Sequence, residues 1–477
     1  GSIHSVAAGM SGGGTVALAG SNTTNALTST VLAQLDSTNL VVNASAVNVL
    51  ARDTSSIQSF AGTVAGGGAA GGGAALALNY LGRTANDEDS SKVVKAEVLN
   101  SIVRVAGPTL VSAYSTSSIQ SIGVAAGASG TAAISGSNAT NLLEDEISAV
   151  WTASNQISTG TLTVSARQAA DIDSLAGNVS GSLGAAVGAA VAVNRIGTAT
   201  RASVVGETSA RFWANLGYWS VSGEDLVLSA ESDNQIDTIA VGMSAGAAGV
   251  QGSVAVSVID SETHATVGAN GHVTNLYFND SVAVTANSRD RIRALAGALG
   301  FGATGVGAAG GVLTNIVKSN TSAGVSGLDT HLDALAQGNG LTVRQSSLAS
   351  APNLMNINQV SDSVLNGASF GTRTVKGLAV QATSIQQIGA VTAVAGGGFS
   401  GAAGAAMNVD QIGGSTRAYI DSAKFVNDSA NGNAAQATDV MATNHAITDK
   451  RRQDHISDLE SLIAALGRKQ ASLTKKE

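Results

Sequence analysis

A short motif that recurs along the chain constrains its fold more than any other feature. The motif is an apolar residue, any residue, a second apolar residue, any residue and Ala, followed by Ile six residues after that Ala. Its first complete copy reads Val47, Val49, Ala51 and Ile57, and a weaker copy has Thr109 in the first place. The isoleucines, here called anchors, are Ile3, Ile57, Ile119, Ile172, Ile236, Ile292 and Ile388, which are 54, 62, 53, 64, 56 and 96 residues apart. Such a repeat predicts structural units that stack on one another.

Apolar residues alternate with a period of two inside each unit. Val187, Ala189, Val191 and Val193 are one example. This period predicts strands, here about one every ten residues and about four in a unit. Each unit runs from the anchor through a Gly/Ala run, a turn and a short segment with a central Ala, such as residues 201–204. We therefore predict an all-β, repeat-built β-solenoid with one or two coils in each unit.

The Gly/Ala runs predict unusually thin packing. The chain has 58 Gly residues, and side chains this small fill an interior only where two backbones approach closely. A helical glycine zipper is the alternative, and the alternation of Val disfavours it. Thr54 to Gly82 and Gly377 to Val409 are long and uncharged enough to suggest membrane-spanning helices, but repeated Gly is unfavourable in a helix.

The repeat divides the chain into three parts. Residues 1–425 form the β-repeat array, with an insertion at about 327–376, and residues 426–448 form a linker. Residues 449–477 are predicted to be an amphipathic α-helix with a charged tail. Its apolar face consists of Ile456, Leu459, Leu462, Ile463 and Leu466. This helix caps the open end of the solenoid or, in the alternative interpretation, docks to a partner.

Composition excludes some classes of function. A net charge of −8 disfavours nucleic-acid binding, which requires clustered Lys and Arg. The chain has no Cys, which fits a bacterial surface protein made without disulfides.

Three motifs that look catalytic coincide with repeat positions. Ser11 and Ser244 lie in GxSxG strings, and the string that begins at Gly300 matches GxGxxG. All three residues lie eight positions after an anchor. A motif that recurs at one position of a repeat belongs to the scaffold, so we predict that the protein is not an enzyme.

Calcium is the only cofactor that the residue types suggest. Carboxylates cluster at Asp87 and Asp89 and again at Glu144 and Asp145, and Ca²⁺ prefers oxygen ligands. Solvated acidic loops are the favoured interpretation, because neither cluster has the spacing of a known calcium loop.

The repeat resembles that of a known class of proteins. Val191 to Asn194 ends a Gly/Ala strand, and Thr416 to Ile420 reads T-x-A-Y-I. Both are similar to repeats of large bacterial filamentous adhesins, the leukotoxin-like and filamentous-haemagglutinin-like exoproteins. The likeness covers roughly residues 1–425. It implies a fibrous, β-helical, non-enzymatic protein outside the cell or on its surface that attaches to host surfaces or extracellular matrix or builds biofilm.

These observations leave three functional hypotheses, of which a structural adhesin segment or filament subunit is favoured. The first alternative is a membrane-active toxin or outer-membrane component whose Gly/Ala runs enter lipid. The second is a polysaccharide-active β-helix enzyme, which is disfavoured because only Trp213, Tyr218 and Trp219 group in one stretch. The array begins and ends within a unit, and we expect the unpaired strand edges to promote self-association into a homo-oligomer or filament.

Overall fold

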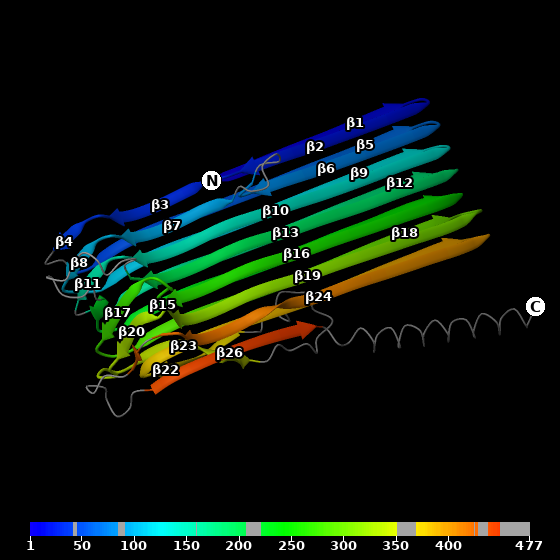
Figure 1. The fold of residues 1–477 in the computed structure, drawn as a ribbon. Coiled ribbons are helices and arrows are strands. Elements are labelled where there is room, and N and C mark those ends of the chain that lie inside the picture. Colours follow the sequence, from blue (N-terminus) through cyan, green and yellow to red (C-terminus); the bar gives the residue numbers. More distant parts are fainter. Residues whose placement is uncertain are drawn as a thin grey trace, which may run out of the picture.

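The protein is an all-β solenoid built from three parallel sheets (Figure 1). The computed structural model describes residues 1–41, 45–83, 91–158, 160–206, 221–350, 369–423, 425–427 and 437–448. Sheet A and sheet B are long and lie face to face, and the short sheet C closes the space between them at one end. The predicted fold class is confirmed for the array.

The strands of each sheet come from successive coils. Sheet A consists of β1 (Ser2–Gly13), β5 (Val47–Gly67), β9 (Thr109–Ser129), β12 (Leu162–Ser182), β15 (Leu226–Gly246), β18 (Val282–Gly302), β23 (Gly377–Gly398) and β26 (Ala437–Thr448). Sheet B consists of β2 (Val16–Leu27), β3 (Thr30–Asp36), β6 (Ala70–Leu81), β7 (Lys92–Leu99), β10 (Ala132–Thr152), β13 (Ala185–Val205), β16 (Ala248–Val267), β19 (Val306–Ser326) and β24 (Gly401–Asp421). Sheet C consists of β4 (Asn39–Val41), β8 (Ile102–Val105), β11 (Asn155–Ser158), β14 (Val221–Gly223), β17 (Val273–Phe278), β20 (Asp329–Ala334) and β25 (Phe425–Val426).

Each sequence unit makes one coil. The chain follows a strand of sheet A to a tight turn, returns along sheet B and crosses through sheet C to the next coil. The strands of sheets A and B are mostly 21 residues long, as in β12 and β13, and not ten as predicted. The turn expected before Arg201 is absent, because the Gly/Ala run and residues 201–204 are one continuous strand. Neighbours in the same register on both sides supply hydrogen bonds along the whole strand.

The anchors set the register of sheet A. Ile57 lies beside Ile119, which lies beside Ile172, and Ile236 and Ile292 follow in the same column. All seven anchors belong to this column, with Ile3 at one end and Ile388 at the other. Equivalent residues of every repeat are therefore stacked directly on one another.

The interior consists of layers that run through all coils. The largest apolar layer lies among the three sheets, at the end of the solenoid that sheet C closes, here called the wide end. Leu162, Trp151 and Leu276 are fully buried there. The anchors form a second apolar layer with Leu81, Leu143 and their equivalents from sheet B. Polar residues of sheets A and B occupy the space between these two layers, as well as the space on the far side of the anchors.

An asparagine ladder fills the polar layer beyond the anchors. The Nδ2 of Asn25 donates to the Oδ1 of Asn79 over 2.8 Å, and Asn79 and Asn141 donate in turn to Asn141 and Asn194 over 2.7 Å. Asn79 also donates to the Oγ of Ser59 across the interior. The ladder satisfies buried amides and ties the first four coils together.

Most coils bend sharply at the residue that follows the sheet B strand. Asn100 and Ala153 have left-handed backbone conformations there, with φ of 48°, and Gly268 and Gly327 follow at φ of 74° and 106°. The Ala153 amide donates to the Val205 carbonyl of the next coil over 3.0 Å. The chain thus leaves sheet B at one fixed place in each coil.

Two expectations about domain boundaries change, and a third is not tested. The predicted insertion begins with β20, a regular strand of sheet C, and only β21 (Leu341–Ser350) and β22 (Ser369–Val375) form an added antiparallel hairpin. Residues 437–448 of the predicted linker are β26, whose Val440 and Ala442 pair with Val380 and Ala382. A linker is predicted there because Thr448 stands where an anchor Ile would be. The predicted helix lies outside the described residues.

Candidate interaction surface

Sheets A and B converge beyond the anchors into a thin blade. A Cβ atom added at Gly127 would lie 2.8 Å from the Ile134 carbonyl oxygen, and one added at Gly300 would lie 2.0 Å from that of Ala308. Backbones of opposite sheets therefore touch, and only Gly, Ala and small polar residues fit between them. The thin packing predicted from the Gly/Ala runs is confirmed.

The large apolar side chains of the blade point outward. Strand geometry places the residues three, five, seven and nine positions after each anchor on the outer side of sheet A. We call these residues the apolar face: Val6, Ala8, Met10, Gly12, Phe60, Gly62, Val64, Gly66, Ile122, Val124, Ala126, Ala128, Leu175, Gly177, Val179, Gly181, Ile239, Val241, Met243, Ala245, Leu295, Gly297, Leu299, Phe301, Val391, Ala393, Ala395 and Gly397. No polar or charged residue interrupts it. Val6 is 77% and Met10 87% exposed, and Ile122 and Ile239 in the centre are about 40% exposed.

The apolar face ends at a polar column. One position after the anchors, sheet A presents His4, Gln58, Gln120, Asp173, Asp237 and Arg293. The Nε of Arg293 donates to Asp237 of the neighbouring coil over 2.6 Å, and Gln58 donates to Gln120 over 3.0 Å. This column marks where the protein surface changes from apolar to hydrophilic.

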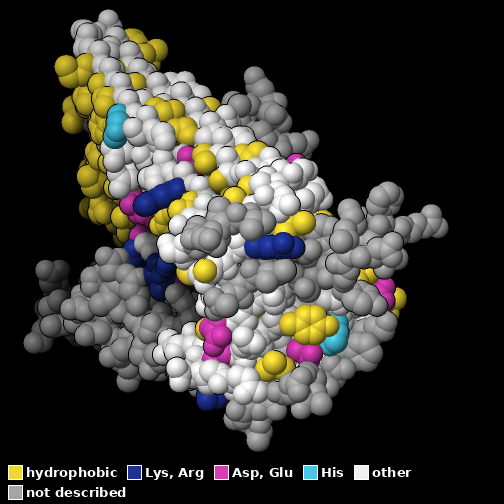
Figure 2. All heavy atoms as spheres, turned by 90° about the vertical axis from the view of Figure 1, so that its left-hand side faces the viewer, with side chains coloured by type: hydrophobic (Ala, Val, Ile, Leu, Met, Phe, Trp, Pro, Cys, Tyr) yellow, Lys and Arg dark blue, Asp and Glu magenta, His cyan; other side chains and the backbone are white. Residues whose placement is uncertain are grey.

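The outer side of sheet B is less uniform. It carries exposed apolar residues such as Val187 and Val250, but Asn22 and Asn138 interrupt them. The side chain of each Asn accepts a hydrogen bond from the Thr hydroxyl two residues further along the strand. Figure 2 shows hydrophobic side chains gathered along one edge of the protein as it recedes from the viewer. Uncovered apolar patches with a polar rim are typical of surfaces that bind a partner.

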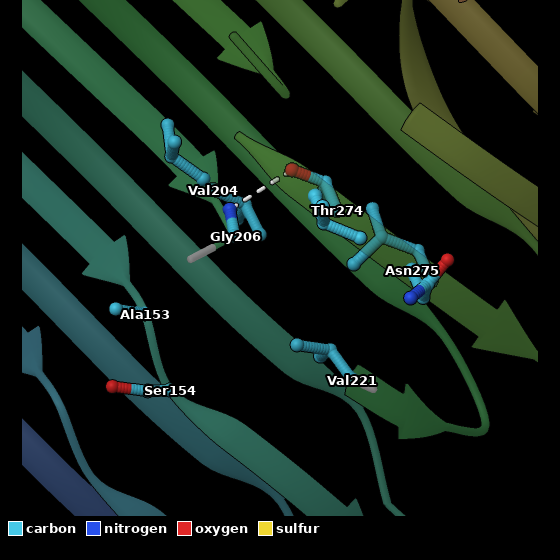
Figure 3. A pocket seen from close by; sticks show the side chains of 10 residues that line it. Ala153, Ser154, Val204, Gly206, Val221, Thr274 and Asn275 are labelled. Carbon is cyan, nitrogen blue, oxygen red and sulfur yellow. Dashed lines mark hydrogen bonds between the residues drawn. The ribbon is translucent and has the colours of Figure 1, made fainter. Parts of the chain in front are cut away.

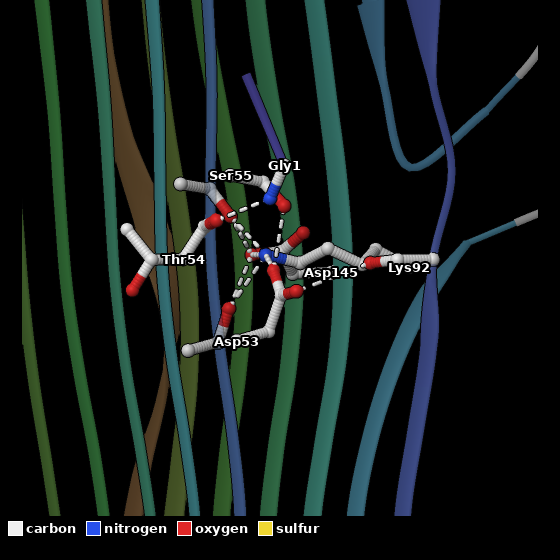
Figure 4. A network of polar contacts seen from close by, with 9 residues as sticks. Gly1, Asp53, Thr54, Ser55, Lys92 and Asp145 are labelled. Atoms are coloured by element: carbon white, nitrogen blue, oxygen red, sulfur yellow. Dashed lines mark hydrogen bonds and ion pairs between the residues drawn. The ribbon is translucent and has the colours of Figure 1, made fainter.

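A buried charge network lies between the two apolar layers (Figure 4). The Nζ of Lys92, on β7, lies 3.0 Å from Asp53 of β5 and 3.4 Å from Asp145 of the next coil, and it donates to Ser115 and Ser117. The Lys92 side chain is fully buried. Partial burial acts to raise the pKa of Asp53, but hydrogen bonds from Ser55 and Lys92 outweigh it and lower that pKa below its usual value. Burial dominates at Asp145 and raises its pKa.

A second buried polar network, centred on Asp290, lies deeper in the stack. Asp290 accepts hydrogen bonds from Asn234 over 2.6 Å, Ser288 over 2.7 Å and Ser261 over 2.9 Å. Burial raises its pKa, and the hydroxyl and amide donors act in the opposite direction. Both networks connect sheets A and B between adjacent coils, so we interpret them as structural elements of the core.

Of the four candidate calcium ligands, the structure describes two, and these two point apart. Asp87 and Asp89 lie outside the described residues. Glu144 and Asp145 are neighbours on β10, so their side chains point to opposite sides of sheet B. Glu144 lies 3.2 Å from Arg83 and 3.6 Å from Arg195 on the outer side of sheet B, whereas Asp145 faces Lys92 inside. Within the described residues, no three His, Asp or Glu side chains are placed to hold a metal ion.

The catalytic-looking motifs occupy strand positions. Ser244 is fully buried in the blade, and Ser11 has the same inward orientation in the first coil. Gly300 is an inward residue of β18. These residues belong to the close contact between sheets A and B.

One small cavity lies near the junction of sheets B and C (Figure 3). Its volume is about 10 Å³, and Ser154, Val204, Gly206, Val221 and Thr274 line it. The Gly206 amide donates to the Oγ1 of Thr274 over 2.9 Å across one side. A cavity of this size accommodates at most one water molecule. Trp213, Tyr218 and Trp219, the aromatic residues that a sugar-binding site would need, lie outside the described residues.

Sequence reasoning missed the apolar face, although its signal was present. Large apolar residues recur three positions after every anchor, and small residues recur two, four and six positions after most of them. This alternation predicts a strand with two unlike sides, but nothing in it tells which side is inward.

The comparisons identify no relative. No known protein family, curated protein or solved structure matches this chain. The described part of the chain contains no helix long and apolar enough to cross a bilayer.

Proposed function

We propose that this chain is a structural segment of an extracellular or cell-surface adhesin, which holds binding surfaces at fixed spacing and catalyses no reaction. The observation that carries this proposal is that side-chain columns continue in register from coil to coil. The anchor column runs through seven strands of sheet A, and the asparagine ladder connects four successive strands of sheet B. Such columns couple each coil to its neighbours and favour a stiff rod over a molecule with moving parts.

The added elements also fit a scaffold. The β21–β22 hairpin lies on the outer side of sheet A, where Val343 and Val375 cover Ala283 and Ala379. The chain thus shields the outer apolar residues of sheet A at this point near the wide end, while no residue that the structure describes covers the apolar face of the blade. Surfaces added to a regular scaffold commonly carry recognition.

Surface display tests the proposal. The chain would be displayed on a non-adherent bacterium, and cell attachment to cultured host cells, extracellular matrix and plastic would be compared with cells that display only the carrier. We expect more attachment to at least one of these surfaces. Equal attachment on all three would contradict the proposal.

A membrane-active protein is the second candidate, and the uncharged blade is the observation that favours it. Under this hypothesis the purified chain would release a dye enclosed in phosphatidylcholine vesicles. Dye release together with no gain in attachment would replace the adhesin proposal.

A further inference from the structure

The apolar face is large enough to form a stable interface. It spans seven of the eight strands of sheet A, since the described part of β26 ends at Thr448, level with the anchors. Strand spacing and rise give it dimensions of roughly 34 Å by 23 Å, or about 800 Å². This is about the area that each partner buries in a stable protein–protein complex, roughly 800 Å².

The chemistry of the face restricts its partner. The apolar face offers no charge or hydrogen-bonding side chain, so it cannot select a charged peptide, a nucleic acid or a sugar. Its regular features are flatness and columns of apolar side chains repeated at the strand spacing. Two such sheets pack face to face about 10 Å apart.

A lipid bilayer fits the blade less well than a protein surface does. Insertion into hydrocarbon would also bury the outer side of sheet B, including the amides of Asn22 and Asn138 and the hydroxyls of Thr24 and Thr140. Burial of these groups in lipid is unfavourable. A partner that covers only sheet A leaves them in water.

We propose that the apolar face binds the apolar face of a second copy of this chain. A twofold axis that runs parallel to the strands, midway between the two sheets, places the same columns opposite each other, which satisfies the requirement that a symmetric interface match itself. The polar column that contains Gln120, Asp173 and Asp237 then forms part of the hydrated rim. This pairing goes beyond the scaffold function and differs from association through strand edges.

Two double variants within the same pair of coils test the pairing. Val179 and Met243 are neighbours on the apolar face, 46% and 40% exposed, and Val187 and Val250 are neighbours on the outer side of sheet B, 43% and 47% exposed. V179K/M243K places four ammonium groups in the symmetric interface, whereas V187K/V250K adds the same charges outside it. We expect wild type and V187K/V250K to dimerise at micromolar concentration, and V179K/M243K to bind itself at least about 100-fold more weakly.

Sedimentation velocity over a dilution series measures the association, and circular dichroism with thermal melting verifies folding. If V179K/M243K does not fold, V6K/M10K replaces it, because Val6 and Met10 are the most exposed large residues of the face. A monomeric wild type at all concentrations would overturn the pairing. Equal association of the two double variants would also overturn it and would point to strand edges. Binding of a monomeric wild type to phosphatidylcholine vesicles would identify lipid as the occupant instead.

Discussion

At the scale of single residues, the coil turns store local strain. Ala153 adopts a left-handed conformation with φ of 48° at the position where Gly268 and Gly327 stand in later coils. A Cβ atom is unfavourable there, and glycine carries no such penalty. The turn nevertheless forms because the Ala153 amide bonds to Val205 of the next coil.

Replacing Ala153 by Gly should therefore stabilise the protein. The strain that Gly relieves at this position is larger than the free-energy cost of the more flexible unfolded chain. We therefore expect the free energy of unfolding to increase by about 0.5–1 kcal/mol. Thermal and urea unfolding of A153G and wild type measure it. A decrease in stability would show that the turn tolerates Ala without strain.

Asp171 makes stability depend on pH. Burial, followed by the charges of Asp173 and Asp237, raises its pKa to about 7, and Arg291 and Arg293 only partly oppose this. The unfolded chain loses this proton near pH 3.8, whereas the folded protein keeps it until about pH 7. Between these values the folded state binds more protons than the unfolded chain does. The free energy of unfolding therefore decreases as the pH rises from about 4, and the decrease is complete above pH 7.

Asp171→Asn removes this charge and should stabilise the protein most at alkaline pH. The gain should be close to zero at pH 4 and should rise to roughly 2–4 kcal/mol above pH 7. Urea unfolding of both proteins across this pH range provides the measurement. A gain that is the same at every pH would mean that Asp171 does not titrate as proposed.

At the scale of the strand pair, the blade depends on where a strand carries Gly. Inward positions, such as Gly300 and Gly249, face a backbone oxygen of the opposite sheet, and outward positions, such as Gly310 and Gly252, face open space. Glycines a few residues apart thus have opposite roles. The inward ones permit the close approach of the two sheets.

The pair Gly300→Ala and Gly310→Ala separates these roles. The added methyl group at position 300 would lie 2.0 Å from the Ala308 oxygen, and we expect a loss of about 2 kcal/mol or more. At position 310 no atom lies within 4 Å, and Ala should be neutral or stabilise by about 0.5 kcal/mol. Melting temperatures of the two variants give the comparison. Equal effects would argue against contact between the backbones of sheets A and B.

At the scale of the whole molecule, the coils are interchangeable in register. Asp171 pairs with Gln235 and Ile172 with Ile236, so each residue of β12 has its equivalent one coil further on. A strand that passes directly from Asp171 to Ile236 lies between β9 and β18, which carry equivalent residues in the same register. The fold therefore does not depend on one particular number of coils.

Deletion of residues 172–235 should leave a folded protein that is one coil shorter. We expect an unchanged β-type circular dichroism spectrum and a rod shortened by about 4.8 Å, the spacing of strands in a sheet. Small-angle scattering measures the length. A variant that lacks only part of a coil serves as the comparison. If the variant that lacks a whole coil unfolds while the comparison variant stays folded, the repeats are not equivalent.

The sequence by itself determined the stack and its register. Identical motifs in parallel strands bring like residues together, so the repeat alone is enough to place the anchors Ile57, Ile119 and Ile172 side by side. It also indicated thin packing at the Gly/Ala runs. It could not reveal β26, whose Thr448 replaces the anchor, because a single polar substitution breaks the motif although the strand still pairs.

Only the tertiary structure decided which side of the blade faces inward. A period of two gives two sides, here Val, Leu and Met on one and Gly, Ala and Ser on the other, and the larger residues usually form the core. In this protein sheets A and B converge until their backbones touch, as at Gly127 and Ile134. No space remains there for a large side chain, so the small residues turn inward and the apolar ones form the exposed face.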